Sequence, residues 1–273
     1  MSAAKGGSST PPILSNKHHS SASVFEPKAL VREARRQKQL AEVRVPRFCI
    51  LDPDGDIARR LRREGRSHRF EGWPCYHTDM DAFDLGGETA GIIGCAVGAP
   101  YAVLVAEELF ACGCQLLVSI TSAGQIQPVG PTPYFVIIDE ALRDEGTSYH
   151  YAPPSEFAKA DPGLVSMAQR AATLARVQAH AGRSWTTDAP FRETAEAIEA
   201  ARAKGALAVE MEAAALYTFA SVANKPILCF ANVTNNMGQS GADFEKGEAD
   251  GTAASLRLLE AIAALSRGAG AER

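Results

Sequence analysis

The stretch GIIGCAVGAPYAVLVAEELFACGCQLLVSIT, residues 91–121, is the part of the sequence that decides the fold prediction. Its first part, Gly91–Val97, and its last part, Leu116–Thr121, are short apolar runs, which are typical of strands buried on both faces. Between them, Ala102–Ala111 carries apolar residues at three- and four-residue spacing, which indicates a helix. The stretch therefore predicts a strand, a covering helix and a second strand parallel to the first.

The same alternation of strand and helix continues on both sides of this unit. Because the strands are apolar throughout, we predict a single α/β domain with a mostly parallel, twisted central sheet and helices on both faces. The other predicted strands are Phe48–Leu51, Phe135–Asp139, Leu207–Val209 and Ile227–Val233, and the other predicted helices are Glu26–Val43, Pro162–His180, Ala195–Lys204, Glu212–Ala223 and Ala249–Ser266.

Composition and charge exclude two classes of protein. The chain has 273 residues, of which 46% are hydrophobic and 22% are charged, and its formal net charge is −4. We expect no nucleic-acid partner, because nucleic-acid binding requires a concentrated positive surface. We also expect no membrane partner, because no apolar run approaches the about 20 residues that span a bilayer.

The sequence predicts one folded domain behind a polar tail. Residues 1–23 are rich in Ser, Gly, Pro and His, which predicts disorder, and residues 24–273 show neither a repeat nor a second type of composition. Cysteines in apolar runs and an N-terminus without the apolar core of a secretory signal predict a cytoplasmic protein. The close pair Cys112 and Cys114 lacks a second Cys/His pair, so we expect no metal and no bound cofactor.

Four stretches place small residues, hydroxyls or carboxylates directly after a predicted strand, where α/β sheets bind their ligands. A glycine-rich turn can offer backbone N–H groups to an anion, although a plain tight turn explains it as well, and several hydroxyls suit a phosphate or a sugar. The stretches are Gly94–Pro100, Ser119–Ile126, Thr186–Thr194 with an acid, an aromatic ring and an arginine, and Val209–Leu216 with two glutamates around a methionine.

These residues resemble the nucleoside phosphorylase family, which includes uridine phosphorylase and the hexameric bacterial purine nucleoside phosphorylases. The resemblance runs from about Val24 to the last helix, and Glu-Met-Glu is its most specific element. The five segments that carry it are Ser-His-Arg (Ser67–Arg69), Val-Ala-Glu-Glu-Leu (Val105–Leu109), Ser-Ala-Gly-Gln-Ile-Gln-Pro (Ser122–Pro128), Thr-Asp-Ala-Pro-Phe-Arg-Glu (Thr187–Glu193) and Glu-Met-Glu-Ala-Ala-Ala-Leu (Glu210–Leu216).

The resemblance implies a pentosyltransferase of nucleotide salvage. Inorganic phosphate, as co-substrate, would cleave the N-glycosidic bond of a purine or pyrimidine nucleoside and give the free base and (deoxy)ribose 1-phosphate. Glu212 would accept hydrogen bonds from the ribose hydroxyls, and Asn235 would bind the departing base, so these two are the expected catalytic residues. The ribose subsite would contain Glu210, Met211, Glu212 and His150, the base subsite Pro190, Phe191 and Asn235, and the phosphate subsite Ser122, Arg69 and Gly98.

Two of these residues carry further implications. Arg69 matches an arginine that reaches the phosphate of a neighbouring subunit, so the resemblance implies a homodimer or a trimer of dimers. Asn235 stands where purine enzymes use an aspartate and uridine enzymes an arginine. Because an amide both donates and accepts hydrogen bonds, the nucleobase stays open.

The sequence departs from the family at the expected phosphate site. Pro53 and Ile57 stand in place of a glycine and an arginine, and Ser119 stands in place of a second arginine. Arg59 or Arg60, on the next helix, could supply the missing positive charge.

Three hypotheses therefore stay open. The leading hypothesis is a phosphorylase with a rearranged phosphate site. It rests on the retained residues Arg69, Ser122, Met211 and Glu212. A hydrolytic nucleosidase, which uses water as nucleophile, is favoured by the lost arginines. The third is a non-catalytic nucleoside-binding homologue, which keeps the fold without the chemistry.

Overall fold

The last strand of the quoted stretch, β5 (Leu116–Gln125), lies in the middle of the sheet. The computed structural model describes residues 10–236 and 251–271. β1 (Phe48–Asp52) and β10 (Ile227–Asn236) both pair with β5 in parallel, and β4 (Thr89–Gly94) pairs in parallel with β1. This buried parallel centre confirms the predicted α/β class.

Antiparallel pairs complete the sheet on one side of this centre, and a mixture of parallel and antiparallel pairs completes it on the other. On one side, two short strands extend the sheet from β4 to its edge. On the other side, β5 pairs with β9 as well as with β10, so that β5, β9, β8, β6 and β10 close into a ring. The additional strands are β2 (Ser67–Arg69), β3 (Asp81–Asp84), β6 (Tyr134–Asp144), β7 (Phe157–Lys159), β8 (Ala179–Thr187) and β9 (Ala206–Glu210).

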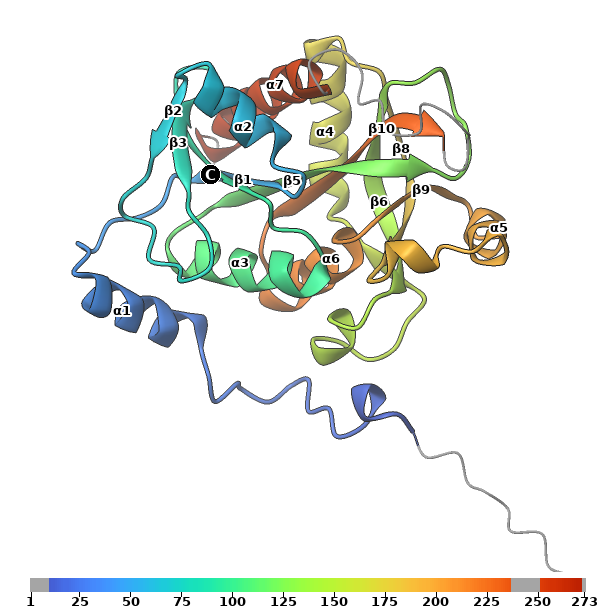
Figure 1. The fold of residues 1–273 in the computed structure, drawn as a ribbon, viewed down its shortest axis with the longest axis horizontal. Helices are drawn as coiled ribbons and strands as arrows, with labels where there is room; N and C mark the ends of the chain where they lie inside the picture. Colours follow the sequence, from blue (N-terminus) through green and yellow to red (C-terminus); the bar gives the residue numbers. More distant parts are fainter. Residues whose placement is uncertain (1–9, 237–250, 272–273) are drawn as a thin grey trace, which may run out of the picture.

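Helices cover both faces of the sheet, as predicted (Figure 1). Phe48 and Ile50 of β1 point into one hydrophobic core, and Cys49 and Leu51 point into the other, which is the alternation expected of a strand. α2 (Asp56–Arg63), α4 (Pro162–Ala175) and α7 (Thr252–Ala271) cover the first face, and α3 (Ala99–Ala111) and α6 (Ala213–Ala223) cover the second.

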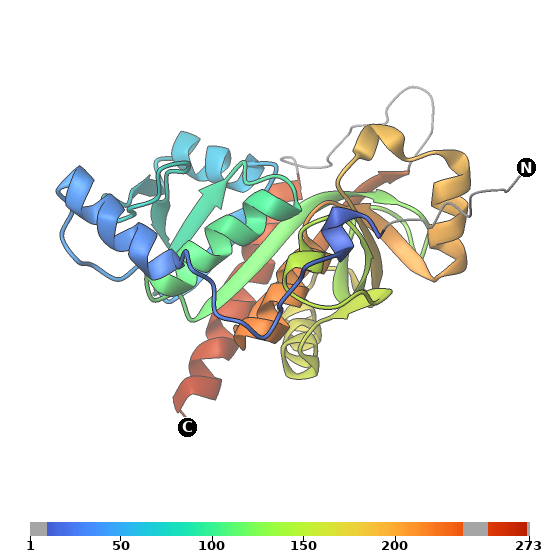
Figure 2. The same cartoon turned by 90° about the horizontal axis from the view of Figure 1, so that it is seen from below.

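The segment before β1 lies against the second face (Figure 2). It contains η1 (Pro12–Leu14) and α1 (Pro27–Lys38), and Lys17 contacts the loop that carries His150. α5 (Ala195–Ala203) lies outside β9. The division at residue 23 stays a prediction. None of the helices in the described part of the chain is long and apolar enough to cross a membrane.

Candidate functional site

The turn from β9 into α6 is held together by the carboxylate of Glu210. This carboxylate is 4% exposed, and one of its oxygens accepts the backbone N–H groups of Glu212 and Ala213, each at 2.7 Å. Its other oxygen accepts hydroxyl hydrogen bonds from Ser184, at 2.9 Å, and from Thr186, both on β8. All four donors belong to the protein, so Glu210 fixes the turn that presents Glu212.

Glu212 occupies the N-cap position of α6 and has a very different environment. It is 1% exposed, and its Oε1 accepts the backbone N–H of Gly98 at 2.8 Å. Its Oε2 has no hydrogen-bond partner among the described residues. Burial, followed by the nearby charge of Glu210, raises the pKa of Glu212 to about 8. Within the described ranges, one carboxyl oxygen of Glu212 therefore lacks a hydrogen-bond donor.

Gly98, predicted to bind phosphate, instead gives its N–H to Glu212. It begins α3 with φ 90°, in the left-handed half of the backbone map that favours glycine. The glycine-rich turn thus joins two strand ends of the site.

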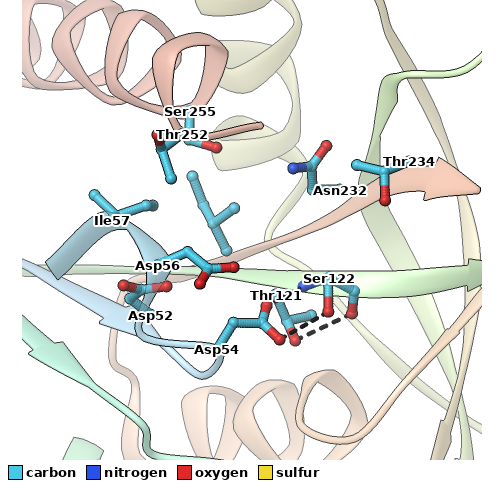
Figure 3. Close-up of a pocket in the computed structure, with 11 residues that line it drawn as sticks. Asp52, Asp54, Asp56, Ile57, Thr121, Ser122, Asn232, Thr234, Thr252 and Ser255 are labelled. Atoms are coloured by element: carbon cyan, nitrogen blue, oxygen red, sulfur yellow. Dashed lines mark hydrogen bonds between the residues drawn. The ribbon is translucent and has the colours of Figure 1, made fainter. Parts of the chain in front are cut away.

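An aspartate occupies the donors that the sequence analysis assigned to phosphate. The Asp54 carboxylate accepts the Ser122 backbone N–H at 2.6 Å and the Ser122 hydroxyl at 2.8 Å (Figure 3). Asp54 comes from the loop after β1, and its charge also contributes to the raised pKa of Glu212. Asp54 was not among the predicted site residues, although its place two positions after the buried strand β1 was the signal that could have found it.

A small polar pocket lies beside this aspartate (Figure 3). Its volume is about 20 Å³, which is enough for a water molecule. Burial raises the pKa of Asp52, one of its walls, to about 7. The residues around the pocket are Asp52, Asp54, Asp56, Ile57, Ile120, Thr121, Ser122, Asn232, Thr234, Thr252 and Ser255.

The arginines considered for phosphate bind elsewhere. Arg59 donates to the backbone carbonyl of Asp54 at 2.7 Å and pairs with an aspartate of its own helix. Arg60 donates to the hydroxyl of Thr252 at 2.9 Å, at the edge of the pocket. Arg69 is exposed and pairs with Asp79 at 2.7 Å. Within the described part of the chain, none of these three guanidinium groups bonds to Ser122.

The other residues predicted for the base and the ribose come from several elements. Phe191 is 99% exposed, in η3 (Pro190–Arg192). Met211 is half-buried in the turn between the two glutamates. Asn235 belongs to β10, but its side chain is outside the described part of the structure.

His150 lies on a larger cavity of about 820 Å³, which also has Pro100 and Asp188 in its walls. The histidine belongs to η2 (Ser148–His150), and its Nδ1 lies 3.0 Å from the Lys17 ammonium. The buried Arg143 holds the loop by donating to the Ser148 hydroxyl at 2.9 Å. Pro100 is two positions after Gly98, so this cavity begins beside the group that binds Glu212.

Comparison with known proteins supplies the family. A family model described as the phosphorylase superfamily matches residues 47–265. The chain belongs to this superfamily. It is 29% identical over 222 residues to uridine phosphorylase of Thermococcus kodakarensis, a match that covers 72% of this chain and 73% of that protein. This confirms the family to which the sequence motifs pointed.

Two further comparisons show the range of names. A DeoD-type purine nucleoside phosphorylase of Streptococcus pyogenes is 26% identical over 203 residues, covering 69% of this chain and 86% of that protein. The fold is similar to that of the Campylobacter jejuni 5′-methylthioadenosine/S-adenosyl homocysteine nucleosidase, with a TM-score of 0.65 at 16% identity over 80% of this chain and 98% of that one. Phosphorylases and a nucleosidase thus share this architecture.

Proposed function

We propose that the protein cleaves the N-glycosidic bond of a nucleoside and that water is the nucleophile. The hydrogen bonds from Ser122 to the Asp54 carboxylate carry this proposal. A phosphate bound to the same two donors would bring its negative charge against Asp54, and like charges at hydrogen-bond distance repel strongly. The small volume of the adjoining pocket suits water better than phosphate.

In the proposed reaction, Asp54 acts as the general base. The proton of the water passes to Asp54 while the water oxygen forms a bond to C1′ of the ribose. The C1′–N bond breaks, its electron pair leaves with the base, and the base takes up a proton from solvent, while Asp54 returns the proton of the water to solvent. Glu212 accepts hydrogen bonds from the ribose hydroxyls and stabilises the positive charge that develops on the sugar. Asn235 is the proposed partner of the departing base.

Phosphorolysis is the second candidate, supported by the names of the two relatives and by Arg60 at the pocket edge. It requires the Asp54 carboxylate to leave Ser122, so that phosphate and a guanidinium can meet there. Its product is (deoxy)ribose 1-phosphate instead of the free sugar.

The deciding experiment measures free base released from uridine, thymidine, inosine, guanosine and adenosine, each with and without inorganic phosphate. We expect release without phosphate, with free sugar as the second product. Release only when phosphate is present, together with a sugar phosphate, would overturn the hydrolytic proposal and establish phosphorolysis. Saturable nucleoside binding without turnover would identify a non-catalytic homologue.

We also propose a cytoplasmic homodimer or trimer of dimers, in which Arg69 acts across the subunit interface if phosphorolysis, the second candidate, is the reaction. The exposure of Arg69 supports this proposal, because its guanidinium is accessible to another subunit. Arg69→Ala and Glu212→Ala subunits are mixed and assayed together. Recovery of activity in the mixture is expected if one site combines residues of two subunits, and two inactive proteins that stay inactive on mixing contradict it.

A further inference from the structure

Glu210 and Glu212 are two buried carboxyl groups two positions apart, and the protein treats them unequally. Glu210 accepts four hydrogen bonds, two from backbone N–H groups and two from hydroxyls. Glu212 accepts one from Gly98, and its second oxygen has no partner among the described residues. The difference lies in the number of donors, since both groups are almost fully buried.

Such a pair does not hold two negative charges at neutral pH. Burial raises the pKa of both carboxyl groups, and the charge of Glu210 raises the pKa of Glu212 further. The pair therefore retains one proton. Hydrogen-bond donors stabilise the ionised form of an acid, and they are concentrated on Glu210. We therefore expect the proton on Glu212, whose Oε2 has no hydrogen-bond partner among the described residues.

We propose that Glu210 is a positioning residue whose fixed negative charge sets the pH at which Glu212 ionises. This inference rests on the proposed function for its consequence, because only ionised Glu212 accepts hydrogen bonds from both ribose hydroxyls. Glu210 does not contact the substrate in this proposal. It acts on the reaction only by changing the ionisation of Glu212.

Other groups also face Glu212. Asp54, on the loop after β1, adds a second negative charge, and the N–H groups of Gly98 and Met211 favour the ionised form. Cys229 on β10 is a buried neutral thiol, whose pKa is raised by burial. Of the two carboxylates that raise the pKa of Glu212, Glu210 has the larger effect.

The test titrates the carboxyl carbon of Glu212 by ¹³C NMR in the full-length protein without substrate. The signal is assigned by its loss in Glu212→Gln. In the wild type we expect a midpoint near 8, and in Glu210→Gln a midpoint lower by about one pH unit or more. The rising limb of kcat/KM against pH should move with it. An unmoved midpoint in a folded Glu210→Gln protein would overturn the inference.

Ser184→Ala provides a second test if Glu210→Gln does not fold. This variant keeps the charge of Glu210 and removes one of its four donors. The proton should then shift toward Glu210, whose carboxyl signal should move toward the protonated position at neutral pH. Unchanged signals for both glutamates contradict the proposal, as does a wild-type Glu210 that is protonated at neutral pH.

These titrations are independent of turnover. If the nucleoside panel shows no cleavage while the Glu212 midpoint shifts as expected, the proposed function fails and the positioning role of Glu210 stands. Cleavage with an unshifted midpoint gives the opposite result.

Discussion

Two acidic turns meet at the site, and they use their carboxylates in opposite ways. In the β9–α6 turn, Glu210 accepts hydrogen bonds from the backbone N–H groups of the turn and from a hydroxyl of β8. Its carboxylate therefore stabilises the turn itself. In the β1–α2 loop, Asp54 reaches a different strand and occupies donors that could have held a ligand. The two acids thus differ in what they hold: Glu210 fixes the turn that presents Glu212, and Asp54 joins the β1–α2 loop to Ser122 of β5.

Glu212→Ala should cause the largest loss of activity, because Glu212 is the proposed ribose-binding carboxylate and interacts with the charges of both Glu210 and Asp54. We expect kcat/KM for the best nucleoside to fall by about 10²–10³-fold, as when a group that stabilises transition-state charge is removed. Steady-state release of free base measures the change. Glu199→Ala, an exposed glutamate on α5, is the matched control. A loss of only a few-fold in Glu212→Ala would contradict the proposed role of Glu212 in stabilising charge on the sugar.

Asp54→Asn tests the role of the β1–α2 loop without changing the β9–α6 turn. Without the carboxylate, hydrolysis should fall by about 10²-fold, because the general base is gone. The charge that repels phosphate is gone as well, so base release that depends on phosphate should appear. Both rates come from the same assay with and without phosphate.

Asp56→Asn is the control for this variant, since it removes a charge two positions away, at the start of α2, while Asp54 keeps its bonds to Ser122. Equal effects of the two variants would show that the net charge of the loop matters and the contact with Ser122 does not.

The dependence of stability on pH tests whether both turns hold uncharged acids. The pKa values of Asp52 and Glu212 are raised to about 7 and about 8, so between their ordinary values and these values the folded protein binds more protons than the unfolded chain. Stability should therefore fall as the pH rises from about 4.5 to 8, by up to about 1.4 kcal/mol per pH unit for each group.

Urea unfolding between pH 5 and pH 9 measures this slope. Asp52→Asn and Glu212→Gln should each flatten it, with the effect of Asp52→Asn ending near pH 7. A wild-type stability that rises over this range would contradict the raised pKa values.

The fold class could be predicted because its signals are local. Residues 91–121 contain a strand, a helix and a strand, and each element was visible in its own periodicity. The boundary between α4 and β8 was harder. The predicted helix Pro162–His180 ends at Ala175, where Arg176 adopts φ 53°, and β8 begins at Ala179. A left-handed arginine leaves no composition signal, so the strand was missed.

The site was predictable only in part, because its decisive contacts join distant residues. Glu210 and Glu212 were selected since both lie at one strand end. Asp54 meets Ser122 across 68 positions, and Gly98 meets Glu212 across 114. Such pairs depend on which strands become neighbours, here β1 and β5 in parallel. Local patterns specify strands but not their order, so the hydrogen bonds from Ser122 to Asp54 could not be foreseen.

The smallest expected effect concerns a residue outside both turns. Phe191 is 99% exposed, so Phe191→Ala should leave the free energy of unfolding within about 0.5 kcal/mol of the wild type. If its ring covers a bound base, as the resemblance implies, KM should rise about 3–10-fold with little change in kcat, since the contact binds substrate and transition state alike. Leu174→Ala is the control, because it removes another exposed apolar side chain, on α4, that is 64% exposed and lies outside the predicted site. An unchanged KM would restrict substrate recognition to the two acidic turns and β10.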